Sequence, residues 1–288
     1  MISWAKQTIA TSEISGVLGI SANAAGIAMV HMQQGERPIV MAANVVTATD
    51  NAAQQQAITN FVAANKLANI PTSYVLEQEY KLTKTVLSEL EVAADVVQAR
   101  FALPCLQAKD SAKIMYQITI ADSIPKNIAK LIRTSGAQLT NIDIFELSIL
   151  NLAVLVKDIQ DGALLIALQQ THALLIFYAH GQLYFTRKVP LKAAGILAEE
   201  VQRSCDYFAE SFVAPDVNID KIVFLPSNQD DFELQQHLKN IMDLEIFQLN
   251  LPDYIAYNTT ELSNANMHAT SMLAISAGLR GIAACSSK

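Results

Sequence analysis

Cysteine and histidine, the residue types best suited to catalysis or metal binding, are few in this chain and widely spaced. Cys105, Cys205 and Cys285 stand alone, without the paired spacing of a zinc site. We interpret Cys205 as a small core residue of a helix and the other two as ordinary free thiols. None of the five histidines has a second histidine and a carboxylate at metal-ligand spacing. The sequence therefore predicts no metal site.

Short motifs of other active sites are also missing. The chain has no Gly-x-x-x-x-Gly-Lys-Ser/Thr loop, no Gly-x-Gly-x-x-Gly, no Gly-x-Ser-x-Gly and no His-Glu-x-x-His. His172 and His180 flank a predicted hairpin, and histidine is the side chain that titrates near neutral pH. Histidines in hairpins are more often simple turn residues, so neither is assigned a catalytic role.

Charge and composition exclude nucleic acid as an expected partner. The formal net charge is −7 and the pI is near 5.2, and Lys and Arg do not cluster as phosphate binding requires. The first ten residues do not resemble a secretory signal. Leu147–Val156 is too short to cross a bilayer, and Ala269–Ser287 carries Arg280 near its middle, so both are interpreted as buried core helices. We expect a cytoplasmic protein.

Two regions of the chain repeat one order of elements, roughly 145 residues apart, which suggests related halves facing each other across a cleft. The first half begins with strand-like runs at Ser15–Ala22, Gly26–Met32 and Pro38–Val45, a helix from Ala52 capped by Asp50, and a strand at Thr72–Leu76. The second half has strand-like runs across Ala163–Tyr178, a turn at Ala179–Gln182, a strand at Leu183–Val189 and a helix at Lys192–Phe212.

Each half continues with alternating strands and helices. In the first half, an insertion near residues 77–122 is predicted to hold a helix at Leu87–Phe101 and a strand at Ile114–Ile120. It is followed by a helix at Pro125–Ser135, a strand at Gln138–Ile144 and the apolar run Phe145–Val156. The second half is predicted to continue with Ile219–Leu225, Asp231–Met242, Leu244–Leu249 and a C-terminal helix at Asn266–Ala284 that returns toward the cleft. The predicted lobes are residues 1–156 and 157–288.

Four segments resemble proteins of one superfamily. Residues 201–208 read Val-Gln-Arg-Ser-Cys-Asp-Tyr-Phe and resemble a helix of type IV pilus assembly proteins of the PilM kind. Residues 141–152 read Asn-Ile-Asp-Ile-Phe-Glu-Leu-Ser-Ile-Leu-Asn-Leu and are similar to a segment of the MshI proteins, which serve biogenesis of the mannose-sensitive haemagglutinin (MSHA) pilus. Tyr80–Leu82 and Ala277–Gly281 also fit. The resemblance implies an α/β fold of the actin-like ATPase (ribonuclease H-like) type. That fold has two lobes, each with a mixed sheet of about five strands and flanking helices.

The resemblance also implies a nucleotide cleft that has lost its acids. Members that hold ATP place Asp-x-Gly in the first turn of each lobe, where glycine lets the backbone approach the phosphates and the carboxylate orients Mg²⁺. Here the turns align as Ser21-Ala-Asn23 and Ala167-Leu-Gln169, which have neither the acid nor the glycine. This loss removes several kcal/mol of transition-state stabilisation, so we expect a non-catalytic protein that uses no cofactor and no metal.

The degenerate cleft is predicted to include Ser21, Asn23, Gln169, Gly278 and Arg280. Three alternatives stay open. Asp158 or Asp161 could reach the cleft from just before a strand, ATP could still be bound without hydrolysis, and the glycines near Arg280 could instead serve close helix packing.

By resemblance, the partner is the short N-terminal tail of an inner-membrane protein of the PilN type, bound as an extended peptide. The groove is expected between Tyr80 and Asp122, where Arg100 and Lys113 face either the groove or solvent. The protein would then be cytoplasmic and peripheral to the inner membrane. One alternative is a working ATPase or sugar-kinase relative. Another is the cytoplasmic domain of a type II secretion L-type protein, which normally continues into a membrane span that this chain does not show.

Overall fold

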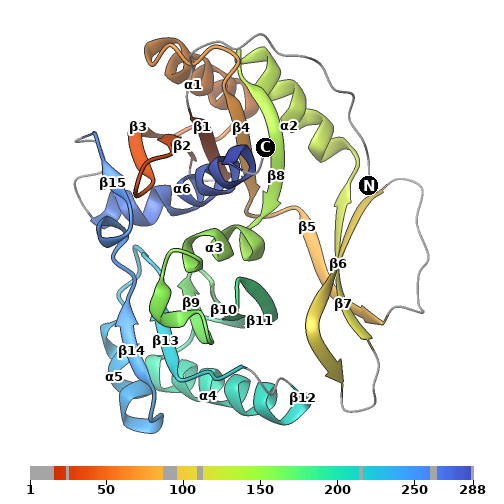
Figure 1. Cartoon of the computed structure of the whole chain (residues 1–288), viewed down its shortest axis with the longest axis vertical. Coiled ribbons are helices and arrows are strands. Elements are labelled where there is room, and N and C mark those ends of the chain that lie inside the picture. Colours follow the sequence, from red (N-terminus) through yellow and green to blue (C-terminus); the bar gives the residue numbers. More distant parts are fainter. Residues whose placement is uncertain are drawn as a thin grey trace.

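The computed structural model describes residues 16–23, 26–86, 96–108, 113–213, 217–259 and 265–286. Two sheet-bearing lobes lie one above the other, with helices α3 (Phe145–Ala153) and α6 (Ala265–Ser286) between them, and a third sheet stands to one side (Figure 1). This arrangement confirms the two-lobed α/β architecture that the sequence repeat predicts.

The first-lobe sheet has the strand order β15-β3-β2-β1-β4-β8 within the described residues. Its strands are β1 (Val17–Asn23), β2 (Gly26–Gln33), β3 (Ile39–Val46), β4 (Pro71–Leu76), β8 (Gln138–Ile144) and β15 (Ala256–Tyr257). The first three form the predicted antiparallel meander, while β4 and β8 run parallel to β1. Because β15 comes from the second half of the chain, both halves contribute to this sheet.

Alternation along β1 explains why helices cover both faces of this sheet. Leu18 and Ile20 face helices α1 (Asn51–Ala64) and α2 (Ser123–Thr134), whereas Val17 belongs to the core on the opposite face, beneath α6. Asp50 caps α1 as predicted, since its side chain accepts a hydrogen bond from the Ala53 amide at 2.8 Å. Gly136 takes a positive φ of 83° and ends α2.

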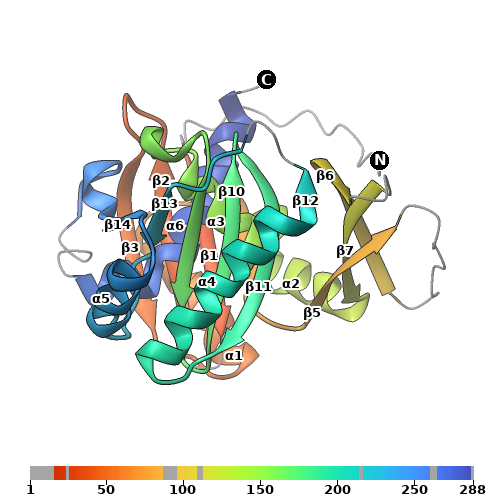
Figure 2. The same ribbon diagram turned by 90° about the horizontal axis from the view of Figure 1, so that it is seen from below.

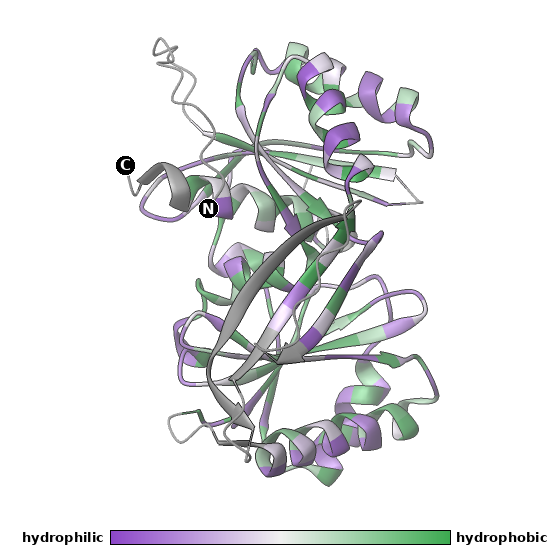
Figure 3. Ribbon diagram, turned by 90° about the vertical axis from the view of Figure 1, so that its right-hand side faces the viewer, coloured by the Kyte–Doolittle hydropathy of each residue, from purple (hydrophilic) through white to green (hydrophobic). Residues whose placement is uncertain are grey.

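The second-lobe sheet has the order β11-β10-β9-β13-β14. Its strands are β9 (Ala163–Leu168), β10 (His172–Ala179), β11 (Gln182–Pro190), β13 (Lys221–Phe224) and β14 (Glu245–Gln248), with helices α4 (Ala194–Ser211) and α5 (Phe232–Ile241). The meander β9-β10-β11 repeats the plan of the first lobe. Along the outer helices of both lobes, hydrophilic residues alternate with hydrophobic ones (Figure 3), as helices with one buried face require.

The insertion forms a sheet of its own, with the order β12-β6-β7-β5. Its strands are β5 (Tyr80–Val86), β6 (Val96–Ala108), β7 (Lys113–Ala121) and β12 (Phe212–Val213), which comes from the second lobe (Figure 2). The helix predicted at Leu87–Phe101 is wrong from Val96 onward, and its earlier part lies outside the described residues. Val97, Ala99 and Phe101 alternate with polar residues, which is the two-residue period of a strand. The apolar residues of this segment fit both periods, and the segment forms a strand.

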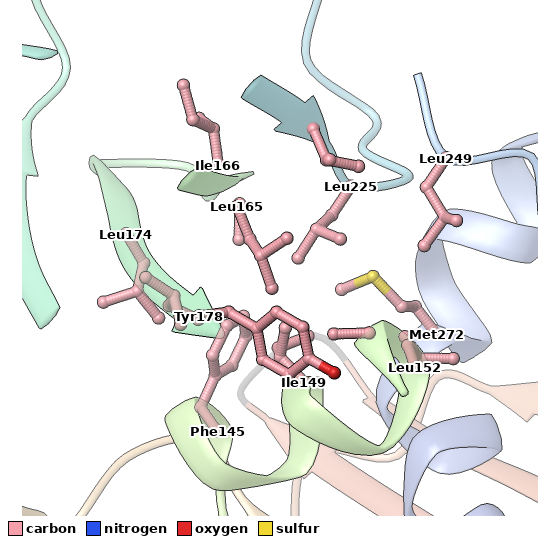
Figure 4. Packing of buried hydrophobic residues seen from close by; sticks show 14 of the residues in the cluster. Phe145, Ile149, Leu152, Leu165, Ile166, Leu174, Tyr178, Leu225, Leu249 and Met272 are labelled. Carbon is pink, nitrogen blue, oxygen red and sulfur yellow. The ribbon is translucent and has the colours of Figure 1, made fainter. Parts of the chain in front are cut away.

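One apolar core runs from the first lobe into the second. Phe145, Ile149 and Leu152 on α3 meet Leu165 and Tyr178 of the second-lobe sheet (Figure 4), and Met272 of α6 joins the same cluster. The remaining short elements are the 3-10 turns Lys157–Ile159 and Leu251–Asp253. Because α3 begins directly after β8, it leads the chain from the edge of one sheet into the other lobe.

Candidate functional site

The carboxyl ends of β1, β4 and β8 form one edge of the first-lobe sheet, beside the second lobe. The three strands are parallel, and Ala22, Leu76 and Ile144 lie side by side in the register. The residues at or next to these ends are Asn23, Glu77 and Asp143, so the topology gathers an amide and two carboxylates at this edge. We call it the junction edge. In open α/β sheets, ligands bind outside the carboxyl ends of the strands.

The first predicted turn is closed by its own hydrogen bonds. The Asn23 side-chain amide donates to the two carboxylate oxygens of Glu77 at 3.3 and 3.1 Å, and its carbonyl accepts from the Gly26 amide at 3.3 Å. Burial raises the pKa of Glu77, and the bond from Asn23 opposes that rise. Ser21 is 3% exposed within β1, paired with Ala28 and Val75.

Gln169 lies in the matching turn of the second lobe, where its backbone N–H donates to the His172 backbone carbonyl at 2.9 Å. The Ser227 hydroxyl donates to the Leu168 carbonyl at 3.0 Å and supports this turn from the neighbouring loop. Asp158 and Asp161 precede β9, whereas Gln169 follows it. A strand of this length spans about 20 Å, so the two acids and Gln169 lie at opposite ends of β9. Neither acid can therefore take the place of the missing carboxylate in the turn at Gln169.

Helix α6 places Gly278 against the sheet rather than beside open space. A Cβ on Gly278 would meet the Met32 side chain at 2.7 Å, and a Cβ on Gly281 would meet Val17 at 2.3 Å. On the facing strand, a Cβ on Gly19 would meet the Ala274 carbonyl oxygen at 1.9 Å. The glycines of α6 therefore allow its close approach to β1 and β2, the packing alternative that the sequence left open.

Arg280 is half-exposed and directed to the junction edge. Its Nε atom lies 3.6 Å from Oδ2 of Asp143, a buried carboxyl that also accepts from the Ile144 amide at 3.1 Å. Oδ2 itself has no hydrogen-bond partner in the described part of the chain. Burial raises the pKa of Asp143, while Arg280, the Ile144 amide and Asn151 oppose that rise. The sequence analysis missed Asp143, although an acid between Ile142 and Ile144 at a strand end was a usable signal.

A second buried acid joins three parts of the molecule. Glu146, in the first turn of α3, has a side chain only 2% exposed. The hydroxyl of Tyr80 from the inserted sheet donates to this carboxylate, and the ammonium of Lys188 from β11 lies 3.7 Å away. Burial and Glu146 together raise the pKa of Tyr80. Sequence reasoning missed this cluster because its members are far apart along the chain.

The inserted sheet makes further contacts with the second lobe. The Thr186 amide donates to the Tyr116 hydroxyl at 2.9 Å. The Lys84 ammonium lies 4.1 Å from the ring centroid of Phe185 and 5.7 Å from that of Tyr207. The insertion therefore bridges the lobes instead of projecting freely from the first one.

Among the described residues, no group of three or more His, Cys, Asp or Glu side chains is arranged to hold a metal ion. The helices that the structure describes include none with the length and apolar character to span a membrane. The junction edge offers two carboxylates with raised pKa values and one guanidinium, set between two lobes.

Comparison with known proteins identifies the fold. No protein-family model and no curated protein sequence matches the chain. Its structure is similar to a chain of a PilM-PilN type IV pilus biogenesis complex, with a TM-score of 0.69, 12% identity, and coverage of 93% of this chain and 98% of that one.

A Bacteroides thetaiotaomicron protein described as having an actin-like ATPase fold and unknown function matches with a TM-score of 0.53, 10% identity, and coverage of 91% of this chain and 95% of that one. The cytoplasmic domain of EpsL, an inner-membrane component of the type II secretion system of Vibrio cholerae, matches with a TM-score of 0.49, 14% identity, and coverage of 92% and 97%. Taken with the two meander-led lobes and the helices between them, the likenesses to the PilM-PilN complex chain and to the Bacteroides protein establish that the chain has the actin-like ATPase fold.

Proposed function

We propose that this chain is a non-catalytic adaptor of a type IV pilus assembly platform, of the MSHA type. It binds the N-terminal tail of a PilN-like inner-membrane protein and stays at the cytoplasmic face of that membrane. The proposal is supported by the likeness to a chain of a PilM-PilN complex and by the resemblance of residues 141–152 to a segment of MshI proteins. The structural observation that carries it is an open strand edge in the inserted sheet.

Strand β6 is paired along one side only for most of its length. Residues Val96–Ala102 pair with β7, and on the other side β12 covers only Gln107 and Ala108. Within the described residues, the sheet order leaves the rest of that side without a strand. Unpaired backbone N–H and C=O groups on a strand edge are a template for adding an extended peptide.

The pairing of β12 shows that this edge accepts an extended segment. Phe212 and Val213 join it antiparallel, with Phe212 opposite Ala108. A partner tail that continues the same strand toward Val96 would use main-chain hydrogen bonds and need few specific side chains. Such a tail would lie within the insertion, where the resemblance places the groove.

The test is co-purification of the full chain with its PilN-like partner, with and without the partner's N-terminal tail. Removing the tail should abolish binding. On the adaptor side, Gln98→Pro and Ala99→Pro form a matched pair, because neighbouring residues of an antiparallel strand point their N–H groups to opposite sides. One of the two prolines removes a backbone hydrogen bond to β7 and destabilises the fold. The other removes only a backbone N–H that points away from β7.

The proline variant that keeps the wild-type melting temperature should lose tail binding by about ten-fold or more, a change of about 1.4 kcal/mol. Wild-type affinity in that variant, or binding of the partner without its tail, refutes the adaptor site.

A nucleotide-hydrolysing enzyme is the second candidate, and the two carboxylates of the junction edge favour it. Glu77 and Asp143 lie at the edge that holds the first predicted turn, and in this reading they replace the missing turn acids. Phosphate release from Mg·ATP separates the candidates. The adaptor should show no release above background. Release at about 1 s⁻¹ or faster that is lost in Glu77→Gln but kept in Asp161→Asn, an exposed acid before β9, establishes the enzyme.

A further inference from the structure

The second lobe has a pocket that the adaptor function does not use. Its volume is about 500 Å³, and it opens between the C-terminal ends of α4 and α5 and the segments that enter β13 and β14. The described residues that line it all belong to the second lobe, and none of them lies at the junction edge or on β6.

The inner wall of the pocket is apolar and includes two stacked aromatic rings. Phe177 and Phe208 are buried and stacked, with ring centroids 4.8 Å apart. Ile219 and Leu244 are half-buried beside them, and Ile241 at the end of α5 is 41% exposed at the rim. This wall can cover one aliphatic side chain, which would also remove part of the exposed Ile241 from water.

The mouth of the pocket carries negative charge. Asp206 on α4 and Asp243 after α5 both line it, and both are exposed. In the described part of the chain, neither carboxylate has an ion pair, and Lys239, four residues before Asp243, makes none with it. Burial and the neighbouring Asp206 raise the pKa of the Cys205 thiol to about 12, which leaves that wall residue uncharged at neutral pH.

We propose that this pocket binds a protein segment in which one aliphatic side chain is flanked by lysine or arginine. The apolar wall takes the aliphatic group, and the two carboxylates pair with the flanking cations. Nucleic acid and an anionic lipid surface carry the same sign of charge as the mouth and are disfavoured. The pocket is a second docking point for a partner segment, and it does not depend on where the PilN-type tail binds.

Methyl NMR of the full chain tests the proposal with two probe peptides, acetyl-Arg-Leu-Arg-amide and its charge-reversed control acetyl-Glu-Leu-Glu-amide. The basic peptide should shift the methyl signals of Ile219, Ile241 and Met242 in a saturable way. The acidic peptide should bind at least about ten-fold more weakly, a difference of about 1.4 kcal/mol. Equal shifts from both peptides, or saturable shifts only outside the pocket, overturn the proposal.

Substitutions separate charge from shape. Asp206→Asn and Asp243→Asn should each lower the affinity for the basic peptide by about three-fold or more at low salt. Glu233→Gln, an exposed acid in the first turn of the same α5 helix, should leave its affinity unchanged. Ala209 is an exposed residue of α4 that lines the pocket, so Ala209→Leu should narrow the pocket and lower the affinity for both peptides without unfolding the chain. Binding that persists unchanged in Ala209→Leu and in both aspartate variants refutes the site.

Discussion

Asp143 lies in an environment that a carboxyl group disfavours. Its carboxyl is buried at the end of β8, one of its oxygens lacks a hydrogen-bond partner among the described residues, and the nearest cation, Arg280, is 3.6 Å away and half-exposed. A buried charge that is incompletely paired costs stability. An acid held at this cost at the junction edge is consistent with a binding role, either for a partner group or for a nucleotide.

Asp143→Asn should therefore stabilise the chain at pH 7, by about 1 kcal/mol. Because the pKa of Asp143 is raised in the folded state, the folded chain keeps its proton to a higher pH than the unfolded chain. Stability then falls as the pH rises from about 4 through the raised pKa. The advantage of asparagine should vanish below about pH 4, where both states hold a neutral acid.

Urea unfolding of both proteins at pH 4 and pH 7 measures this difference. Asp161→Asn, at an exposed turn position, serves as the control and should change stability equally little at both values. A loss of stability in Asp143→Asn at pH 7 would show that the pair with Arg280 outweighs the cost of burial.

The closest fit between elements is that of α6 on β1. The Gly19 Cα lies so near α6 that an added Cβ would stand 1.9 Å from the Ala274 carbonyl oxygen and 2.6 Å from the Gly278 nitrogen. Both are backbone atoms, so no side-chain rotation can relieve the clash. The helix itself would have to move away from the sheet.

Gly19→Ala should destabilise the chain by about 3 kcal/mol or more, because overpacking against backbone shifts a whole element. Gly195→Ala is the matched control on α4, where an added Cβ meets only the His237 ring at an ordinary 3.5 Å. That change should stabilise by about 0.5–1 kcal/mol, since alanine is the better helix former. Similar melting temperatures for the two variants would contradict the packing described here.

Most elements were predictable from local pattern, and the exceptions have a physical cause. Strands such as Gln138–Ile144 and the helix that Asp50 caps depend on alternation and capping, which a short window of sequence contains. The end of α4 was not predictable in this way. Phe212 continues the apolar stripe of the helix in the sequence, but in the structure it belongs to β12 and pairs with Ala108. That choice is decided by a strand more than a hundred residues away in the chain.

At the scale of the whole molecule, the two lobes are joined by contacts in addition to the two helices between them. Beyond α3 and α6, the cluster of Tyr80, Glu146 and Lys188 and the bond from Thr186 to Tyr116 tie the insertion to the second lobe. The sequence indicated the two lobes and the insertion, whereas the cleft formed by Ser21, Asn23 and Gln169 stays a prediction. It could not indicate the cluster around Glu146, since the partners Tyr80 and Lys188 come from β5 and β11, and the pairing of Asp143 with Arg280 likewise joins distant parts of the chain.

Strand β12 has a mechanical consequence. It has only two residues, it ends the row of strands on the side where a tail would dock, and it follows directly from the end of α4 that lines the pocket. Under tension along the inserted sheet, this two-residue pairing would separate before the longer pairings of the sheet. Its separation from β6 would free the end of α4, the helix that carries the pocket residues Cys205, Asp206 and Ala209.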